Sequence, residues 1–173
     1  MLTLKKGFTV RDIVITGMLA AVCTIATTIK IPYGNGAMVH LGTAALFVSS
    51  ILFGGIRGGL AAAIGSSLFD IIMGFSPYTL WSFFIKGIAG LIAGSIANSG
   101  DAKGRNIVKN IIACVAAAAW TLAGYMAAWT AVAGKFEVAV TNIPSSLMTS
   151  AAGFIVALPL TSALNKALGD RRL

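Results

Sequence analysis

Charge is scarce in this sequence. Asp, Glu, Lys and Arg together make up 10% of the 173 residues, whereas soluble domains typically carry about 25%. Hydrophobic residues make up 57% of the chain, and a water-soluble fold of this size could not bury so much apolar surface. The composition therefore excludes an ordinary soluble domain and indicates an integral membrane protein.

Residues that carry chemistry are also few. The chain has one histidine and two cysteines, which is too few for a cluster of metal ligands, and no plausible Ser/His/Asp set is present. There is no Walker A sequence for ATP hydrolysis and no HExxH motif. Cys23 and Cys114 lie inside apolar runs and are predicted to be small core residues. We therefore expect no enzymatic activity, no metal and no cofactor in this chain.

Six apolar segments are predicted to be helices that cross the membrane. Short polar or Gly/Pro-rich connections separate them. The first segment is long enough to span the bilayer, so we expect a retained helix and not a cleaved signal peptide. The predicted fold is a single all-α transmembrane domain over residues 1–173, with helices at 9–29, 39–53, 58–73, 78–97, 107–132 and 143–168.

Basic residues are distributed unevenly between the two sides of the membrane. Six crossings place both termini on one side, where ten Lys and Arg residues would lie, against Lys30 and Lys135 on the other. The positive-inside rule therefore predicts that both termini are cytoplasmic. Topology and anionic lipid headgroups account for the net charge of +8, so we expect no nucleic-acid partner. The ten residues are Lys5, Lys6, Arg11, Arg57, Lys103, Arg105, Lys109, Lys166, Arg171 and Arg172.

Asp70 and Lys86 are ionisable residues inside predicted helices. Such a group costs at least about 2.5 kcal/mol in the membrane. The two helices are adjacent and antiparallel, so the side chains would form either a buried ion pair that locks the helices or part of a polar cavity open to the outside. Ser82, Lys86, Gly90 and Gly94 share one helical face, and the two glycines form a small-xxx-small pair. Lys86 is therefore predicted to point into the bundle.

Polar and aromatic side chains gather at the predicted outer ends of the helices. Together they suit a small, planar, polar ring that stacks on an aromatic side chain and forms hydrogen bonds. The aromatic residues would equally fit the interfacial belt of a membrane protein. The candidate binding residues are Tyr33, Asn35, His40, Asp70, Tyr78, Trp81, Phe84, Lys86, Tyr125, Trp129 and Asn142, and the start of the last helix adds Ser145 and Ser146.

The first predicted helix carries a surface of small residues. Gly17, Ala20, Ala21 and Thr24 form two small-xxx-small pairs. These residues would either pack inside the bundle or form a docking face for another membrane protein.

The sequence resembles the substrate-binding S components of energy-coupling factor (ECF) vitamin transporters in several short stretches and in their order and spacing along the chain. The resemblance covers nearly the whole chain. Its stretches are 38–42 (MVHLG), 52–59 (LFGGIRGG), 65–74 with Asp70 between two glycines, 85–90 (IKGIAG) and 157–160 (ALPL).

This resemblance implies a high-affinity membrane-embedded binding subunit. It implies a vitamin or precursor bound near the outer face, a transmembrane coupling subunit and two cytoplasmic ATPase subunits as partners, and a location in the bacterial cell membrane. ATP would be used by those partners, and small residues of the first helix would belong to the docking face. The pattern is most similar to S components for hydroxymethylpyrimidine or pyridoxine, with riboflavin and pantothenate as alternatives.

Two other functions remain open from the residues alone. Asp70 and Lys86 would suit the relay of a stand-alone proton-coupled carrier or channel. The chain shows no internal repeat, which disfavours a carrier built from inverted halves. The other possibility is a membrane scaffold without a ligand.

Overall fold

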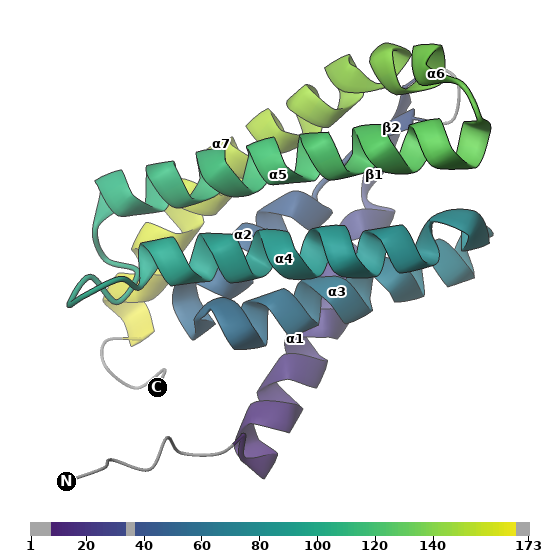
Figure 1. The fold of residues 1–173 in the computed structure, drawn as a ribbon. Helices are drawn as coiled ribbons and strands as arrows, with labels where there is room; N and C mark the ends of the chain where they lie inside the picture. Colours follow the sequence, from purple (N-terminus) through teal and green to yellow (C-terminus); the bar gives the residue numbers. More distant parts are fainter. Residues whose placement is uncertain (1–7, 34–36, 169–173) are drawn as a thin grey trace, which may run out of the picture.

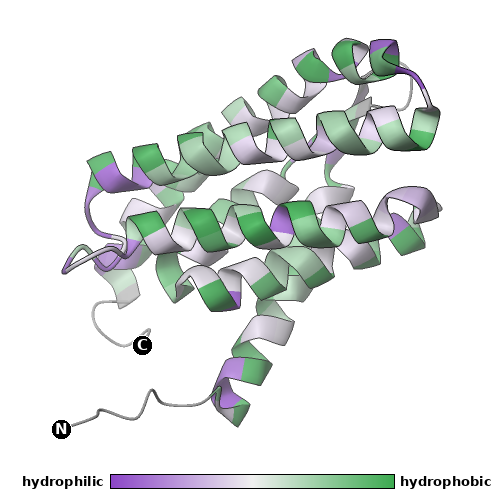
Figure 2. Cartoon of the chain, viewed as in Figure 1, coloured by the Kyte–Doolittle hydropathy of each residue, from purple (hydrophilic) through white to green (hydrophobic). Residues whose placement is uncertain are grey.

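The computed structural model describes residues 8–33 and 37–168 as a bundle of helices (Figure 1). Helix α1 packs on α3, α3 on α4, α4 on α5, and α2 on α7. Hydrophilic residues concentrate at the helix ends and connections (Figure 2). The elements are α1 (Val10–Thr28), β1 (Lys30–Tyr33), β2 (Ala37–His40), α2 (Gly42–Phe53), α3 (Gly55–Ile72), the 3₁₀ turn η1 (Ser76–Tyr78), α4 (Thr79–Ala97), α5 (Ile107–Ala133), α6 (Phe136–Thr141) and α7 (Ile143–Leu168).

Each of the six predicted helices is present. Five of the described helical segments are long and apolar enough to cross a membrane. Helix α2 has only 12 residues, or roughly 18 Å at about 1.5 Å per residue, and the β1–β2 hairpin precedes it. The all-α membrane class is confirmed, whereas the side on which the termini lie stays a prediction from the basic residues.

One end of the bundle is tied together by polar contacts. We call it the basic end: the start of α1, the α2–α3 turn, the connection 98–106 and the end of α7. Thr9 caps α1 in a capping box with Asp12, and Asp12 Oδ1 pairs with Arg57 Nη2 at 2.6 Å. Asn98 Nδ2 donates to the carbonyl of Ile51 at 3.1 Å. The cap of α1 and the Asn98 contact satisfy backbone groups that helix ends leave unpaired, and the ion pair links α1 to α3.

The opposite end differs from the prediction. We call it the hairpin end: the β1–β2 hairpin, η1 and α6. The strands are antiparallel, with Lys30 opposite His40, so residues 39–40 belong to a strand and not to the predicted helix 39–53. The pairing satisfies the backbone groups that each strand turns toward its partner. The short helix α6 was also not predicted.

Glycines set the close approach of α3 and α4. A Cβ on Gly94 would fall on the backbone N and Cα of Gly55. A Cβ on Gly90 would lie 2.6 Å from the Cα of Gly59, which is far inside van der Waals contact. The predicted small-xxx-small pair of α4 is therefore confirmed, and it positions Ser82 and Lys86 toward the interior, where both are buried.

The small residues of α1 differ in burial. Ala20 is buried, and Thr24 Oγ1 donates to the carbonyl of Gly65 in α3 at 3.1 Å. A Cβ on Gly65 would lie 2.7 Å from the carbonyl O of Ala20. Ala20 and Thr24 therefore pack inside the bundle, which corrects their predicted role in docking. Gly17 and Ala21 are exposed at the edge of the same face, beside Thr24.

Candidate binding cavity at the hairpin end

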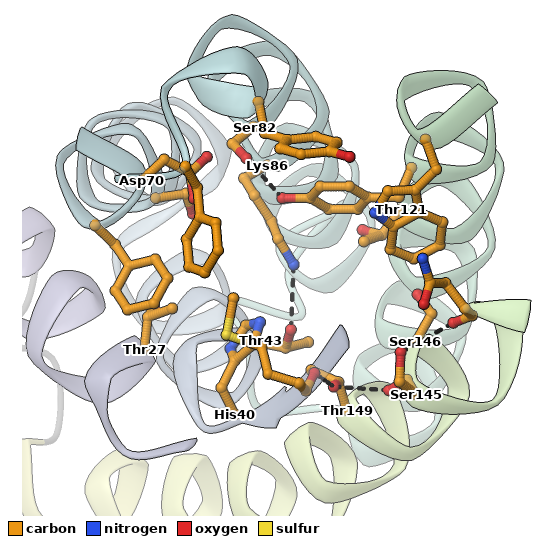
Figure 3. Close-up of a pocket in the computed structure, with 18 of the residues that line it drawn as sticks. Thr27, His40, Thr43, Asp70, Ser82, Lys86, Thr121, Ser145, Ser146 and Thr149 are labelled. Carbon is orange, nitrogen blue, oxygen red and sulfur yellow. Dashed lines mark hydrogen bonds between the residues drawn. The ribbon is translucent and has the colours of Figure 1, made fainter. Parts of the chain in front are cut away.

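A cavity of about 220 Å³ opens between β2, α2, α3, α4, α5 and the α6–α7 region (Figure 3). Seven of the predicted binding residues line it. They come from strand β2 and from helical segments that are far apart in the sequence and that converge at the hairpin end. The seven are His40, Asp70, Tyr78, Lys86, Tyr125, Trp129 and Asn142, and Ser145 and Ser146 also contribute.

Two predicted residues of α4 are not among the described residues that line the cavity. Trp81 and Phe84 are 37% and 61% exposed, because the face of α4 that carries Ser82 and Lys86 turns inward and leaves its neighbours outside. Their predicted place in the site is corrected, and their exposure suits the membrane interface. Tyr33 ends β1, but its side chain and Asn35 lie outside the described residues.

Asp70 and Lys86 lie on the same cavity without forming an ion pair. The ammonium of Lys86 donates to Thr43 Oγ1 at 3.2 Å. Oδ2 of Asp70 is buried and has no hydrogen-bond partner among the described residues. A buried acceptor left without a donor costs about 1–3 kcal/mol, and more when it is charged. The cavity thus presents one cationic donor and one unsatisfied carboxylate oxygen to whatever enters it.

An aromatic wall borders these charges. The rings of Tyr125 and Trp129 stack with centroids 5.6 Å apart, as expected for residues four apart on α5. Tyr125 is held by a hydrogen bond of 2.9 Å between its hydroxyl and Ser82 Oγ, and the ammonium of Lys86 lies 5.4 Å from the centre of its ring. The wall is thus fixed in place beside the Lys86 donor, and a flat ring would find both an apolar face and a polar edge.

His40 contributes a neutral imidazole. Its Nδ1 accepts the backbone N–H of Gly42 at 3.1 Å, which leaves Nε2 to carry the proton. Burial lowers the pKa of His40 to about 3, and the positive charges of Lys86 and Lys30 act in the same direction. His40 can therefore donate one hydrogen bond at physiological pH without adding charge.

The protonation state of His40 can be measured directly, because the chain has one histidine. In the folded protein the pKa of His40 is near 3, so the imidazole stays neutral. An exposed histidine instead gains its proton as the pH falls through about 6.5. We expect the ¹⁵N signals of His40 to stay constant between pH 8 and pH 5 in protein carrying a histidine-free tag. A titration midpoint near 6.5 in folded protein would contradict the neutral state assigned to this half-buried side chain.

Other cavity residues were missed by sequence reasoning. Thr27, Thr121 and Thr149 donate to the carbonyl four residues earlier in their own helices. This is ordinary behaviour for hydroxyls in apolar helices, so the sequence gives no signal that distinguishes them. The remaining missed residues are Met38, Thr43, Ser66, Phe69, Phe75 and Val138, together with Ser82, which was predicted to face inward but not to bind.

A solved structure shares this fold, and a related sequence matches most of the chain. The structure of ThiT from Listeria monocytogenes matches with a TM-score of 0.63 at 17% identity, over 91% of this chain and 94% of that one. An uncharacterized protein from Pyrococcus woesei, encoded in the gap 3′ region, is 26% identical over 148 residues, which cover 86% of this chain and 95% of that protein.

The family model for the ECF-type riboflavin transporter S component matches residues 7–166. This match covers the six helices and both sides of the cavity. It agrees with the resemblance of the sequence to ECF S components and with the helical membrane fold. The chain belongs to the family of ECF transporter S components, which are non-enzymatic membrane proteins that bind small vitamins and work with an ECF module.

Proposed function

We propose that this chain captures a vitamin or vitamin precursor with a single heteroaromatic ring, with hydroxymethylpyrimidine or pyridoxine as the favoured cargo. The observation that carries the proposal is the combination at one cavity of the Lys86 ammonium, the unpartnered Asp70 carboxylate oxygen and the stacked pair Tyr125–Trp129.

The chemistry of this cargo suits the cavity. A pyrimidine or pyridine ring has a flat face for the aromatic wall and a ring nitrogen that accepts a hydrogen bond from Lys86. An exocyclic amino or hydroxymethyl group supplies the donor that Oδ2 of Asp70 lacks. A charge-assisted hydrogen bond contributes about 1.5–3 kcal/mol, so these two contacts would supply much of the affinity.

The size of the cavity supports a single ring. Its volume of about 220 Å³ is below the roughly 300–1,000 Å³ of typical pockets for drug-sized ligands. Riboflavin, with three fused rings and a ribityl chain, would require the cavity to widen. Riboflavin stays the principal alternative because the family model that matches this chain is that of the riboflavin transporter S component.

Ligand titration tests the proposed cargo. Trp129 lines the cavity, so the protein's own tryptophan fluorescence should respond to a bound ring, and Trp129→Phe should abolish that response. We expect hydroxymethylpyrimidine or pyridoxine to bind with submicromolar affinity. Tighter binding of riboflavin would replace the proposed cargo, and millimolar or weaker binding of every B vitamin would overturn the capture function.

We further infer that uptake is driven by a coupling subunit and two ATPases that consume ATP, in a bacterial cell membrane. The support is the lack of a Walker A sequence in this chain. Proteoliposomes that contain the chain alone should not accumulate cargo, whereas the chain with its ECF module and ATP should. Uptake by the chain alone would instead favour a carrier that uses Asp70 and Lys86.

Docking on the module is expected to use the exposed face of α1. A Cβ added at Gly17 would meet no neighbouring helix within 4 Å, and Ala21 lies four residues further on the same face. Gly17→Leu should therefore leave the thermal stability of the isolated chain unchanged and reduce copurification with the module several-fold. The matched control is Val14→Leu, which enlarges an α1 side chain that is already bulky and fills no space left by a small residue. If wild type and Gly17→Leu copurify equally well with the module, this part of α1 is excluded from docking.

A further inference from the structure

A second cavity lies at the basic end, between the start of α5 and the end of α7. Its volume is about 300 Å³, and it is lined by Arg105, Ile107, Asn110, Ser162, Asn165 and Lys166. It shares no lining residue with the cavity at the hairpin end. The vitamin-capture function does not use it.

Two asparagines in this cavity hold one carbonyl group and leave two oxygens unused. Nδ2 of Asn110 and Nδ2 of Asn165 donate to the carbonyl O of Gly104 at 2.9 Å and 2.7 Å. Oδ1 of each side chain is buried and has no hydrogen-bond partner in the part of the chain that the structure describes. Asn110 is only 4% exposed. Because unsatisfied buried acceptors are costly, this pair offers two acceptors to a hydrogen-bond donor that enters the cavity.

The surroundings indicate a ligand that is both anionic and amphipathic. Arg105 and Lys166 bring positive charge to the lining. Ile107 is 51% exposed at the edge of the cavity, and the exposed Ile111 continues the apolar surface one turn further along α5. A charged group in the cavity would therefore adjoin the surface that faces the hydrocarbon of the bilayer. Basic pockets between transmembrane helices are known to suit anionic lipid headgroups.

We propose that this cavity binds the headgroup of an anionic phospholipid that carries free hydroxyl groups, as phosphatidylglycerol does. The phosphate would lie beside Lys166, and the glycerol hydroxyls would donate to Oδ1 of Asn110 and Oδ1 of Asn165. A choline headgroup has no N–H or O–H to donate. An ethanolamine headgroup has donors, but its ammonium would lie near the cationic side chains and its net charge is zero.

Native mass spectrometry of the full chain tests the proposal. Protein in detergent is mixed with phosphatidylglycerol, phosphatidylethanolamine or phosphatidylcholine of identical acyl chains, and retained lipid is counted. We expect phosphatidylglycerol to be retained preferentially. Lys166→Gln should reduce that retention about fivefold. Arg11→Gln is the matched control, since it removes the same charge from the exposed start of α1.

A second variant separates the hydrogen bonds from the charge. Asn165→Leu removes one unsatisfied oxygen and one of the two donors to the Gly104 carbonyl, and it keeps both basic residues, so it should reduce the preference for phosphatidylglycerol over phosphatidylethanolamine. Thermal unfolding and cargo titration of each variant establish that it is folded. Equal retention of the three lipids by wild type, or an effect of Lys166→Gln no larger than that of Arg11→Gln, would overturn the proposal. Its failure would leave the vitamin-capture function untouched.

Discussion

Gly94→Ala should lower the melting temperature by roughly 10 °C. The added Cβ would fall on the backbone of Gly55 at the first turn of α3, and backbone atoms cannot move aside as a flexible side chain does. Overpacking costs about 1–3 kcal/mol in ordinary cores, and this site is at the upper limit because both neighbours are main chain. At roughly 2–4 °C per kcal/mol for a chain of this length, the expected loss is well above the error of a thermal unfolding measurement.

Gly17→Ala is the matched control for this experiment. It makes the same chemical change in another helix interior, but no atom of a neighbouring helix lies within 4 Å of the added Cβ. Replacing glycine in a helix increases helix propensity by up to about 1 kcal/mol, so the control should be neutral or slightly stabilising. If Gly94→Ala and Gly17→Ala unfold at the same temperature, α3 and α4 do not approach as closely as the structure shows.

The helices of this fold could be predicted because lipid imposes a simple rule on the sequence. A segment that crosses the bilayer must be apolar and must pair its own backbone groups. This rule predicts a helix over 143–168, and the structure has α7 over Ile143–Leu168. The face of α4 that packs inward was also predictable, since Gly90 and Gly94 are four residues apart and leave room for a neighbouring backbone.

The hairpin end could not be predicted by the same rule. The partner of Lys30 is His40, and nothing local in either tetrapeptide strand specifies this pairing. Strand β1 also contains Pro32, a residue that argues against a strand interior. The six-residue helix α6 is too short to show a reliable helical period. Residues 30–40 therefore looked like a loop followed by the start of a helix.

The lining residues that could be predicted are of types that are rare in membrane helices. The lining residues that were missed are of types that are common there. Lys86 and Asp70 are conspicuous because charge inside a membrane helix is costly. Thr43 is equally important to the geometry, since it accepts the hydrogen bond from Lys86, but threonines are frequent in such helices. Trp81 was assigned to the site because aromatic residues serve both binding and the membrane interface, and only the packing of α4 separates the two roles.

Lys86→Met should weaken cargo binding about 10- to 100-fold, the loss expected for one charge-assisted hydrogen bond. Methionine has a similar length, so the cavity keeps its shape, but the cationic donor is gone. The fold should tolerate the change. Lys86 forms no ion pair with Asp70 in the described structure, so the change breaks no direct charge pair, and it removes a buried ammonium whose desolvation opposes folding. Fluorescence titration and thermal unfolding of the same sample measure both quantities.

The two outcomes distinguish a cargo-binding lysine from a structural one. If Asp70 and Lys86 formed a lock between α3 and α4, removing one partner would leave a buried charge uncompensated and cost about 3–5 kcal/mol. Lys86→Met would then unfold at a much lower temperature, with the remaining folded protein binding cargo normally. Lys135→Met, which makes the same change at an exposed residue of the hairpin end, should alter neither quantity. Asp70→Asn completes the comparison: because Oδ2 of Asp70 lacks a donor among the described residues, this variant should weaken cargo binding while leaving the free protein at least as stable as wild type.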